Sequence, residues 1–433
     1  MRKLCLSAAV TIALLAQHPS DPTELLAKAR DLAIARAKRL PDYVCVQTVD
    51  RQYFKYLHSV KHLAWPGQQN APPSCAEIAA FDTQNPRDLV LQSTDRLRLD
   101  LKVSEGTEIA TWAGASQFTS RSVFDLDGGG TYETGIMGTF LGDILENGTY
   151  RYKGEESAGD SKLAAYEYRV PLLSSHYRFR TGSGWTPTAY NGVFWVDPDS
   201  LEIRRLMLDA NEMPPETGGC EANTTIEYQA VKVGAGEFLL PVRSSMRMVR
   251  MDGSETRSTA VYSGCRQYRG ESTIRFDDAA APTDVHAAAP GEPLPAGITL
   301  SLALASPIDT DTAAAGDVFT ARLREPGRTS KGVLVPAGAA VGGRIVGMQH
   351  SLIPPQQFTI SVMLEKLELQ GMTAPLFARL SWQAGSTGIS LPPLGQSPLV
   401  ATLVFTTNGS RHIVRAGYQM NWITVEAPLD DNR

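Results

Sequence analysis

The sequence lacks the features that mark several common classes of protein. Its 433 residues carry a net charge of only -5 and contain no Lys- and Arg-rich block of the kind that follows nucleic-acid phosphates. We therefore expect no nucleic-acid partner. After residue 16, no apolar run approaches the roughly 20 residues that a transmembrane helix needs. We therefore expect no membrane span beyond the N-terminal leader.

Motifs for catalysis and for metal or cofactor binding are also lacking. The glycines at 128–130 are not followed by Gly-Lys-Ser/Thr, and no G-x-S-x-G is present. Residues 125–130 resemble the start of a calcium loop, but its twelfth position is Ile136 instead of an acid. His58 and His62 are four apart without the Glu of an H-E-x-x-H motif. We predict no metal, no cofactor and no catalytic residue, which weighs against an enzyme.

The N-terminus has the pattern of a signal peptide. Arg2 and Lys3 precede an apolar run over residues 4–16, which is too short to span a bilayer. We predict a signal peptide at residues 1–17, with cleavage near Ala16 or Gln17, and an uncleaved anchor is the alternative. The predicted location is the periplasm or the extracellular space.

Cysteine is scarce, with five residues in the chain. Cys5 lies inside the leader, which leaves Cys45, Cys75, Cys220 and Cys265 in the mature protein. Four cysteines in an oxidising compartment predict two disulfides, and three pairings are possible. Neighbours in sequence, 45 with 75 and 220 with 265, are the first choice. A simple meander over residues 222–268 would, however, place Cys220 and Cys265 at opposite ends, beyond the reach of a disulfide.

The residues that remain are patterned mainly for strands. One helix is predicted to start at Asp21 and Pro22, with Leu25, Ala29, Leu32 and Ala33 on one face, and to stop before Pro41. Over residues 96–103 aliphatic and charged side chains alternate strictly, which is typical of an antiparallel strand with one wet face. Residues 197–200 (DPDS) form a turn between strands 193–196 and 201–208. The predicted fold class is mainly β.

A change in composition divides the chain. Residues 279–295 are rich in Ala, Pro and Gly, and charged residues are fewer beyond them. We predict a larger antiparallel β domain at 20–277, an Ala/Pro-rich linker at 278–293, and a smaller β-barrel or sandwich domain at 294–433.

Two stretches of the first predicted domain resemble known families. Residues 193–198 (VFWVDP) and 201–204 (LEIR) resemble the outer-membrane lipoprotein carrier, or LolA-like, fold. Residues 239–241 (LLP) and the Tyr262-x-x-Cys265 spacing resemble a group of uncharacterised secreted bacterial proteins with the same plan. These resemblances imply a half-barrel with an opening helix and a helical insert, and they transfer no activity.

The second predicted domain resembles the β-barrel of TrbI-type conjugation proteins. The likeness lies in residues 294–297 (LPAG), 316–323, 335–339 (VPAGA) and 343–346 (GRIV). This chain lacks their transmembrane anchor, so the resemblance implies a fold and not a role in a secretion channel.

One apolar segment with helical spacing interrupts the strands between residues 135 and 147. On a half-barrel, such a helix could act as a lid over a lipid-like ligand, or its apolar side could simply fill the core. The candidate ligand-binding residues are Ile136, Met137, Phe140, Leu141, Ile144 and Leu145.

The sequence alone ranks three functions. The first is a non-enzymatic envelope module that binds an apolar ligand or an acylated or protein partner. The second is a structural scaffold of the envelope that contacts partners through sheet edges. The third is a secreted hydrolase, which would need two carboxylates at glycosidase spacing or a Ser–His pair.

Overall fold

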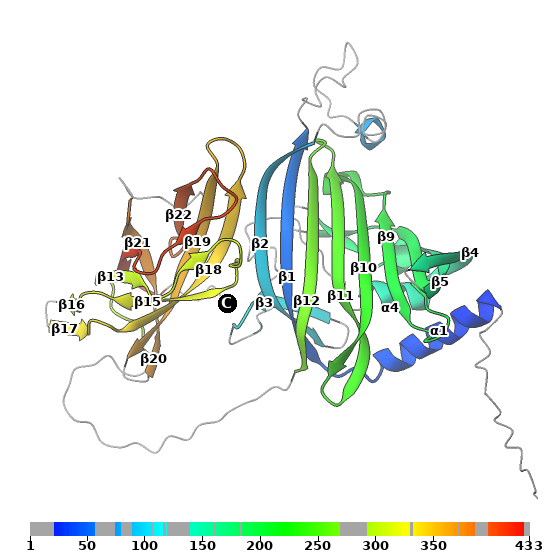
Figure 1. The fold of residues 1–433 in the computed structure, drawn as a ribbon, viewed down its shortest axis with the longest axis horizontal. Coiled ribbons are helices and arrows are strands. Elements are labelled where there is room, and N and C mark those ends of the chain that lie inside the picture. Colours follow the sequence, from blue (N-terminus) through cyan, green and yellow to red (C-terminus); the bar gives the residue numbers. More distant parts are fainter. Residues whose placement is uncertain are drawn as a thin grey trace, which may run out of the picture.

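The computed structural model describes residues 21–56, 74–78, 89–104, 107–115, 118, 139–158, 161–181, 184–268, 292–329, 332–369, 372–385 and 397–427. These residues are mainly strand, and every pairing between the named strands is antiparallel. The predicted mainly β class, with an N-terminal helix and a large antiparallel sheet, is confirmed (Figure 1).

The first sheet has ten strands. In spatial order they are β4 (Thr149–Ala158), β5 (Ser161–Val170), β8 (Tyr190–Val196), β9 (Ile203–Ala210), β10 (Gly219–Val233), β11 (Gly236–Arg250), β12 (Glu255–Gln267), β1 (Tyr43–Tyr56), β2 (Leu89–Ser104) and β3 (Thr107–Trp112). A separate short hairpin consists of β6 (Arg178–Thr181) and β7 (Gly184–Pro187).

Alternating side chains give this sheet one buried face. In β2, Leu97, Leu99, Leu101 and Val103 are all buried, as the period-two pattern predicts. The predicted turn at 197–200 is stabilised by Asp197, whose carboxylate accepts hydrogen bonds from the backbone N–H groups of residues 199 and 200. This turn connects β8 to β9. The apolar side of the resulting hairpin packs into the core of the first sheet.

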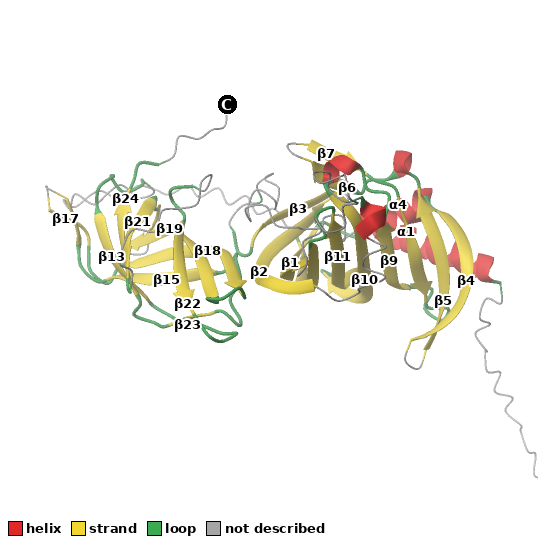
Figure 2. Ribbon diagram, turned by 90° about the horizontal axis from the view of Figure 1, so that it is seen from above, coloured by secondary structure: helices red, strands yellow, loops and turns green. Residues whose placement is uncertain are grey.

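Two helices pack on the buried face of the first sheet (Figure 2). Helix α1 (Pro22–Ala37) begins as predicted: the Asp21 side chain accepts a hydrogen bond from the Thr23 N–H, and Pro22 is the first helical residue. Leu25 and Ala29 bury its apolar face in the core. Helix α4 (Thr139–Asn147) lies in the segment that was predicted to be helical.

The second sheet is formed by the C-terminal residues. Its spatial order is β22 (Ala401–Thr406), β19 (Gln357–Leu369), β18 (Ala340–Ser351), β15 (Val318–Leu323), β13 (Thr299–Leu304), β24 (Gln419–Thr424) and β21 (Ala378–Gln383), with β20 (Met372–Pro375) also on β19. Two small sheets pair β14 (Ile308–Asp309) with β23 (Ile413–Val414), and β16 (Gly327–Thr329) with β17 (Gly332–Val335).

The second sheet does not form a closed barrel, which was one of the two architectures predicted for residues 294–433. Between the described residues of β21 and β22, the two ends of the second sheet, no strand pairing is formed. The curved sheet instead encloses its own apolar cluster, which includes Leu300, Ile360 and Trp422 and is separate from the cluster of the first sheet. Closure depends on the register and shear of the whole sheet, and individual strand patterns do not specify those quantities.

The two sheets are joined through the backbone of β2. Beyond the part of β2 that pairs with β3, residues 93–95 pair with β18 of the second sheet. Between these stretches, the Arg98 N–H donates to the Ala315 carbonyl at 2.6 Å, and the Ala315 N–H donates to the Arg96 carbonyl at 2.9 Å. Gly316 makes this approach possible, because a Cβ atom there would lie 1.9 Å from the Arg98 carbonyl oxygen.

The predicted count of two disulfides is confirmed, but the first-choice pairing is wrong. The bonds join Cys45 to Cys265 and Cys75 to Cys220. Cys45 lies in β1 at a register shift against β12, which carries Cys265, so residues 220 apart in sequence become neighbours across two strands. Cys75 belongs to a short helical segment at 75–78 that packs beside the start of β10. The geometric objection to pairing Cys220 with Cys265 was correct.

Several predicted features lie outside the described residues. They include the signal peptide, the histidines at 58 and 62, the glycine-rich segment at 125–130 and nearly all of the 278–293 linker. Within the ranges that the structure describes, no helix combines the length and the apolar composition that crossing a membrane requires.

Candidate functional site

The candidate site is a cavity of about 510 Å³ between the two helices and the first sheet. Its wall is formed by α1 and α4 and by residues in or next to β9, β10 and β11. Apolar side chains dominate its wall. The charged lining residues lie in the last turn and C-cap of α1, near the end of α4, and just before β9. The lining residues are Leu32, Ala33, Ile34, Arg36, Ala37, Lys38, Leu40, Leu141, Gly142, Leu145, Glu146, Leu201, Glu202, Ile203, Tyr228, Phe238, Leu239 and Leu240.

Helical geometry explains how α4 contributes to this wall. Leu141 and Leu145 are one turn apart and therefore share a face, and both line the cavity. Asp143 points about 160–200° away from them around the helix axis. Its buried carboxylate accepts a 2.8 Å hydrogen bond from the backbone N–H of His176 and lies 2.5 Å from Nδ1 of the His176 imidazole. One face of α4 thus meets the cavity, and the other is anchored to His176 and to the Tyr190 hydroxyl.

The predicted lid residues have different fates. Leu141 and Leu145 line the cavity, whereas Ile144 is fully buried in the core of the first sheet. Phe140 lies within α4, but its side chain is outside the described set. Ile136 and Met137 lie outside the described residues altogether.

The mouth of the cavity carries an ion-pair network. The Glu202 side chain is only 10% exposed, and its carboxylate pairs with Arg36 at 2.6 Å and with Arg204 at 3.0 Å. Two guanidinium groups therefore compensate a nearly buried charge, as burial requires. Lys38 and Glu146 also line the cavity, and both side chains are exposed.

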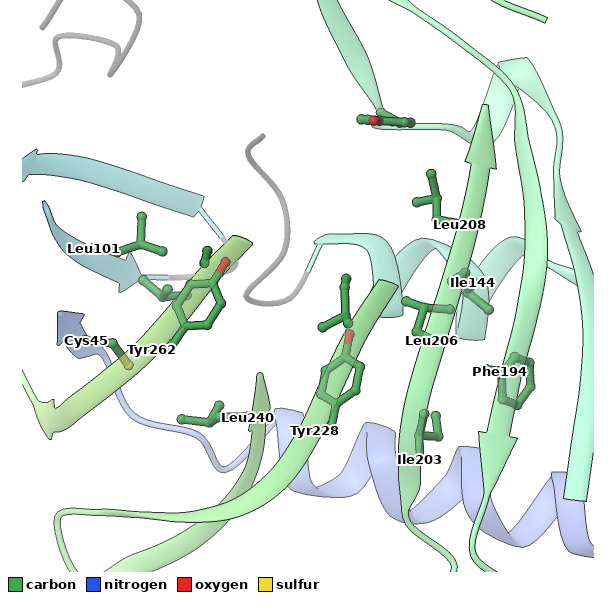
Figure 3. Close-up of a cluster of buried hydrophobic side chains, with 14 of the residues drawn as sticks. Cys45, Leu101, Ile144, Phe194, Ile203, Leu206, Leu208, Tyr228, Leu240 and Tyr262 are labelled. Carbon is green, nitrogen blue, oxygen red and sulfur yellow. The ribbon is translucent and has the colours of Figure 1, made fainter. Parts of the chain in front are cut away.

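A single tyrosine adds a polar group to the wall. Tyr228 is 3% exposed, and its hydroxyl has no hydrogen-bond partner among the described residues. Burial raises the pKa of Tyr228 far above its usual range, so this hydroxyl stays neutral. Figure 3 shows Tyr228 beside Leu240 and Ile203, with α1 running past them. An uncharged donor in an apolar wall can orient one polar atom of a bound molecule.

Sequence reasoning missed most of this wall. It selected α4, but the cavity also depends on α1 and on residues 238–240 of β11. A partial signal was present, because Leu32 and Ala33 continue the apolar face of α1 beyond Leu25 and Ala29. Leu32 and Ala33 line the cavity, whereas Leu25 and Ala29 are buried in the core.

The described residues offer no metal site. Nowhere in those ranges do three His, Cys, Asp or Glu side chains come together as a ligand set. The two cysteine pairs are oxidised to disulfides, which occupies their sulfur atoms. The chemistry available at the cavity is therefore apolar contact, one neutral hydroxyl and a charged mouth.

Comparison with known proteins gives structural neighbours alone. No family model and no curated protein matches the chain. Among solved structures, similarity is found to a LolA superfamily protein from Nitrosomonas europaea, with 12% identity and a TM-score of 0.26 over 57% of this chain and 93% of that one. A putative outer membrane lipoprotein-sorting protein domain from Vibrio parahaemolyticus has 13% identity and a TM-score of 0.27, over 57% of this chain and 94% of its own.

A third neighbour is the lipoprotein LppX from Mycobacterium tuberculosis. It has 11% identity and a TM-score of 0.20, over 59% of this chain and all of its own length. Identities and scores of this size carry no argument about function. What the site can do is therefore argued from its own residues.

Proposed function

We propose that this protein is a non-enzymatic binding module of the cell envelope, and that its cavity holds the apolar chain of a lipid-like ligand. The observation that supports the proposal is the apolar cavity of about 510 Å³ between α1, α4 and the first sheet. Small-molecule sites typically enclose about 300–1,000 Å³ and combine apolar walls with a few polar groups. The LolA-like plan predicted from the sequence belongs to this proposal.

The energetics favour a hydrocarbon chain over a polar ligand. Each methylene group that leaves water contributes about 0.8 kcal/mol, so a chain of several carbons binds without specific polar contacts. The charged groups at the mouth can stay in water while such a chain occupies the interior, since Lys38 and Glu146 are exposed. Glu202 is already paired with two arginines, so it offers no free charge to a ligand.

Maturation outside the cytosol forms part of the same proposal. Two disulfides are typical of proteins that mature in an oxidising compartment. The predicted signal peptide at residues 1–17 would deliver the chain there. Periplasmic and released forms are equally compatible with this chemistry.

Filling the cavity tests the proposal. Ala33 lines the cavity, so Ala33→Phe places a ring inside it, and we expect affinity for an apolar fluorescent probe such as N-phenyl-1-naphthylamine to fall at least ten-fold. The measurement is a fluorescence titration of delipidated protein, with palmitate and a lysophospholipid as competitors.

The matched control is Ala35→Phe. Ala35 lies on the same helix, is exposed and is not part of the cavity wall, so probe binding should match the unmodified protein. If the unmodified protein binds neither the probe nor the competitors, the ligand-binding proposal fails and the scaffold role becomes the better account. Equal loss in the two variants would also contradict the assigned position of the site.

A further inference from the structure

We propose that residues 171–181 and 184–187, named here the apolar tip, dock this protein onto the surface of an anionic lipid bilayer. The apolar tip consists of Pro171, the single turn η2 (Leu172–Ser174), residues 175–177, and the paired strands β6 and β7. The inference rests on the proposed function in one respect: a protein that binds a lipid-like ligand has a reason to approach a membrane. The docking surface itself is argued from exposure, charge and position.

The apolar tip exposes large apolar side chains that a folded protein normally buries. Leu173 is 99% exposed, Leu172 is 50% exposed and Trp185 is 42% exposed. The other nine exposed large apolar residues in the described part of the chain are spread between residues 90 and 413. Single exposed apolar residues need no explanation, but two adjacent leucines at a turn and a tryptophan on a nearby hairpin do.

The charge around these side chains fits an anionic surface. Residues 168–196 contain three arginines and one histidine, at 169, 178, 180 and 176, and no Asp or Glu. The Arg178 side chain is exposed. Proteins that contact a membrane surface typically insert leucine and tryptophan at the level of the lipid headgroups and place arginine beside them.

Two acidic side chains lie near the apolar tip. Glu212 is 3.9 Å from Arg169, and both are well exposed. Glu216 belongs to the short turn η3 (Pro215–Thr217), which lies against β6. These carboxylates reduce the local positive charge without removing it, so apolar insertion is the main contribution and charge sets the lipid preference.

The position of the apolar tip connects it with the cavity. His176 of the apolar tip is hydrogen-bonded to Asp143 of α4. Leu141 and Leu145 of the same helix line the cavity. Figure 2 shows β6, β7 and α4 on the same side of the first sheet. A bilayer at the apolar tip would therefore lie next to the helix that walls the cavity.

Flotation with lipid vesicles tests the proposal on the full mature chain. The probe is vesicles of phosphatidylcholine mixed equally with phosphatidylglycerol, against vesicles of phosphatidylcholine alone. We expect co-flotation with the anionic vesicles, and an at least ten-fold weaker partition for Leu172→Ser/Leu173→Ser. Arg178→Glu should weaken binding to anionic vesicles with less effect on the neutral ones.

Matched controls separate this surface from general stickiness. Val318→Ser/Ile353→Ser removes two exposed aliphatic side chains of the second sheet region, 65% and 53% exposed, and should float like the unmodified protein. No flotation of the unmodified protein, or equal flotation of the Leu172/Leu173 variant, would overturn the proposal. Unchanged thermal unfolding of that variant confirms that it is folded.

The outcome is distinguishable from failure of the proposed function. Ala33→Phe should lose the apolar probe and still float, while Leu172→Ser/Leu173→Ser should bind the probe and fail to float. Flotation without any probe binding would retain the apolar tip and remove the ligand.

Discussion

Replacing Cys45 and Cys265 by serine is expected to lower the free energy of unfolding by about 4 kcal/mol. The bond closes a loop of 220 residues between β1 and β12, so breaking it releases a large part of the unfolded chain. The serines would also place hydroxyls where Cys45 is fully buried. Urea unfolding of the double variant, followed by tyrosine and tryptophan fluorescence, measures the change.

The second disulfide provides the comparison. Cys75 and Cys220 close 145 residues but belong to a small satellite cluster with Ile78 and Val249, outside the main core. We expect their replacement by serine to leave the first sheet cooperative and to cost less than the loss of the first bond. Equal unfolding midpoints for the Cys45/Cys265 variant and the unmodified protein would contradict the assigned pairing.

Arg344→Met is expected to destabilise the protein by about 3–5 kcal/mol. The Arg344 guanidinium is nearly buried, and it pairs with Glu365 at 2.6 Å. It also donates to the carbonyls of Gly316 at 2.6 Å and of Ala113, in the first sheet region, at 2.7 Å. Removing one partner of such a network leaves a carboxylate and two carbonyls without their donor. The free energy of unfolding in urea is the measurement.

Arg322→Met is the matched control for this change. Arg322 also lies on a strand of the second sheet, but it is exposed and makes one 3.2 Å hydrogen bond to the Gly338 carbonyl. Its replacement should change the free energy of unfolding by no more than about 0.5 kcal/mol. Similar costs for the two arginine variants would show that the junction between the sheets contributes little.

Local patterns predicted the elements better than their partners in space. The alternation in residues 96–103 and the Asp21 cap each depend on residues close in sequence. The strand, its buried aliphatic face and the cap are confirmed, whereas Asp100, on the face predicted to be wet, is buried. The disulfide pairing failed because it depends on which strands become neighbours, and β1 pairs with β12, which lies about 200 residues further along the chain. The order of the strands depends on interactions across the complete sheet, so residues close in sequence do not specify it.

The cavity shows the same limit. The helical spacing of residues 135–147 identified α4, and Leu141 and Leu145 do line the cavity. The same spacing could not show that Ile144 would face the core, because the apolar stripe of α4 is wide enough to serve both sides. Nor could it show that residues 238–240 of β11 would complete the wall, since they lie about 90 residues further along the chain.

The most direct test of the central claim is photocrosslinking with a fatty acid that carries a diazirine on its chain. Delipidated protein is loaded, irradiated, digested and analysed by mass spectrometry. Adducts are predicted in α1, in residues 141–146 of α4 and in residues 238–240 of β11, and excess palmitate should suppress them. Adducts confined to other surfaces, or unchanged by palmitate, would contradict a lipid-binding cavity.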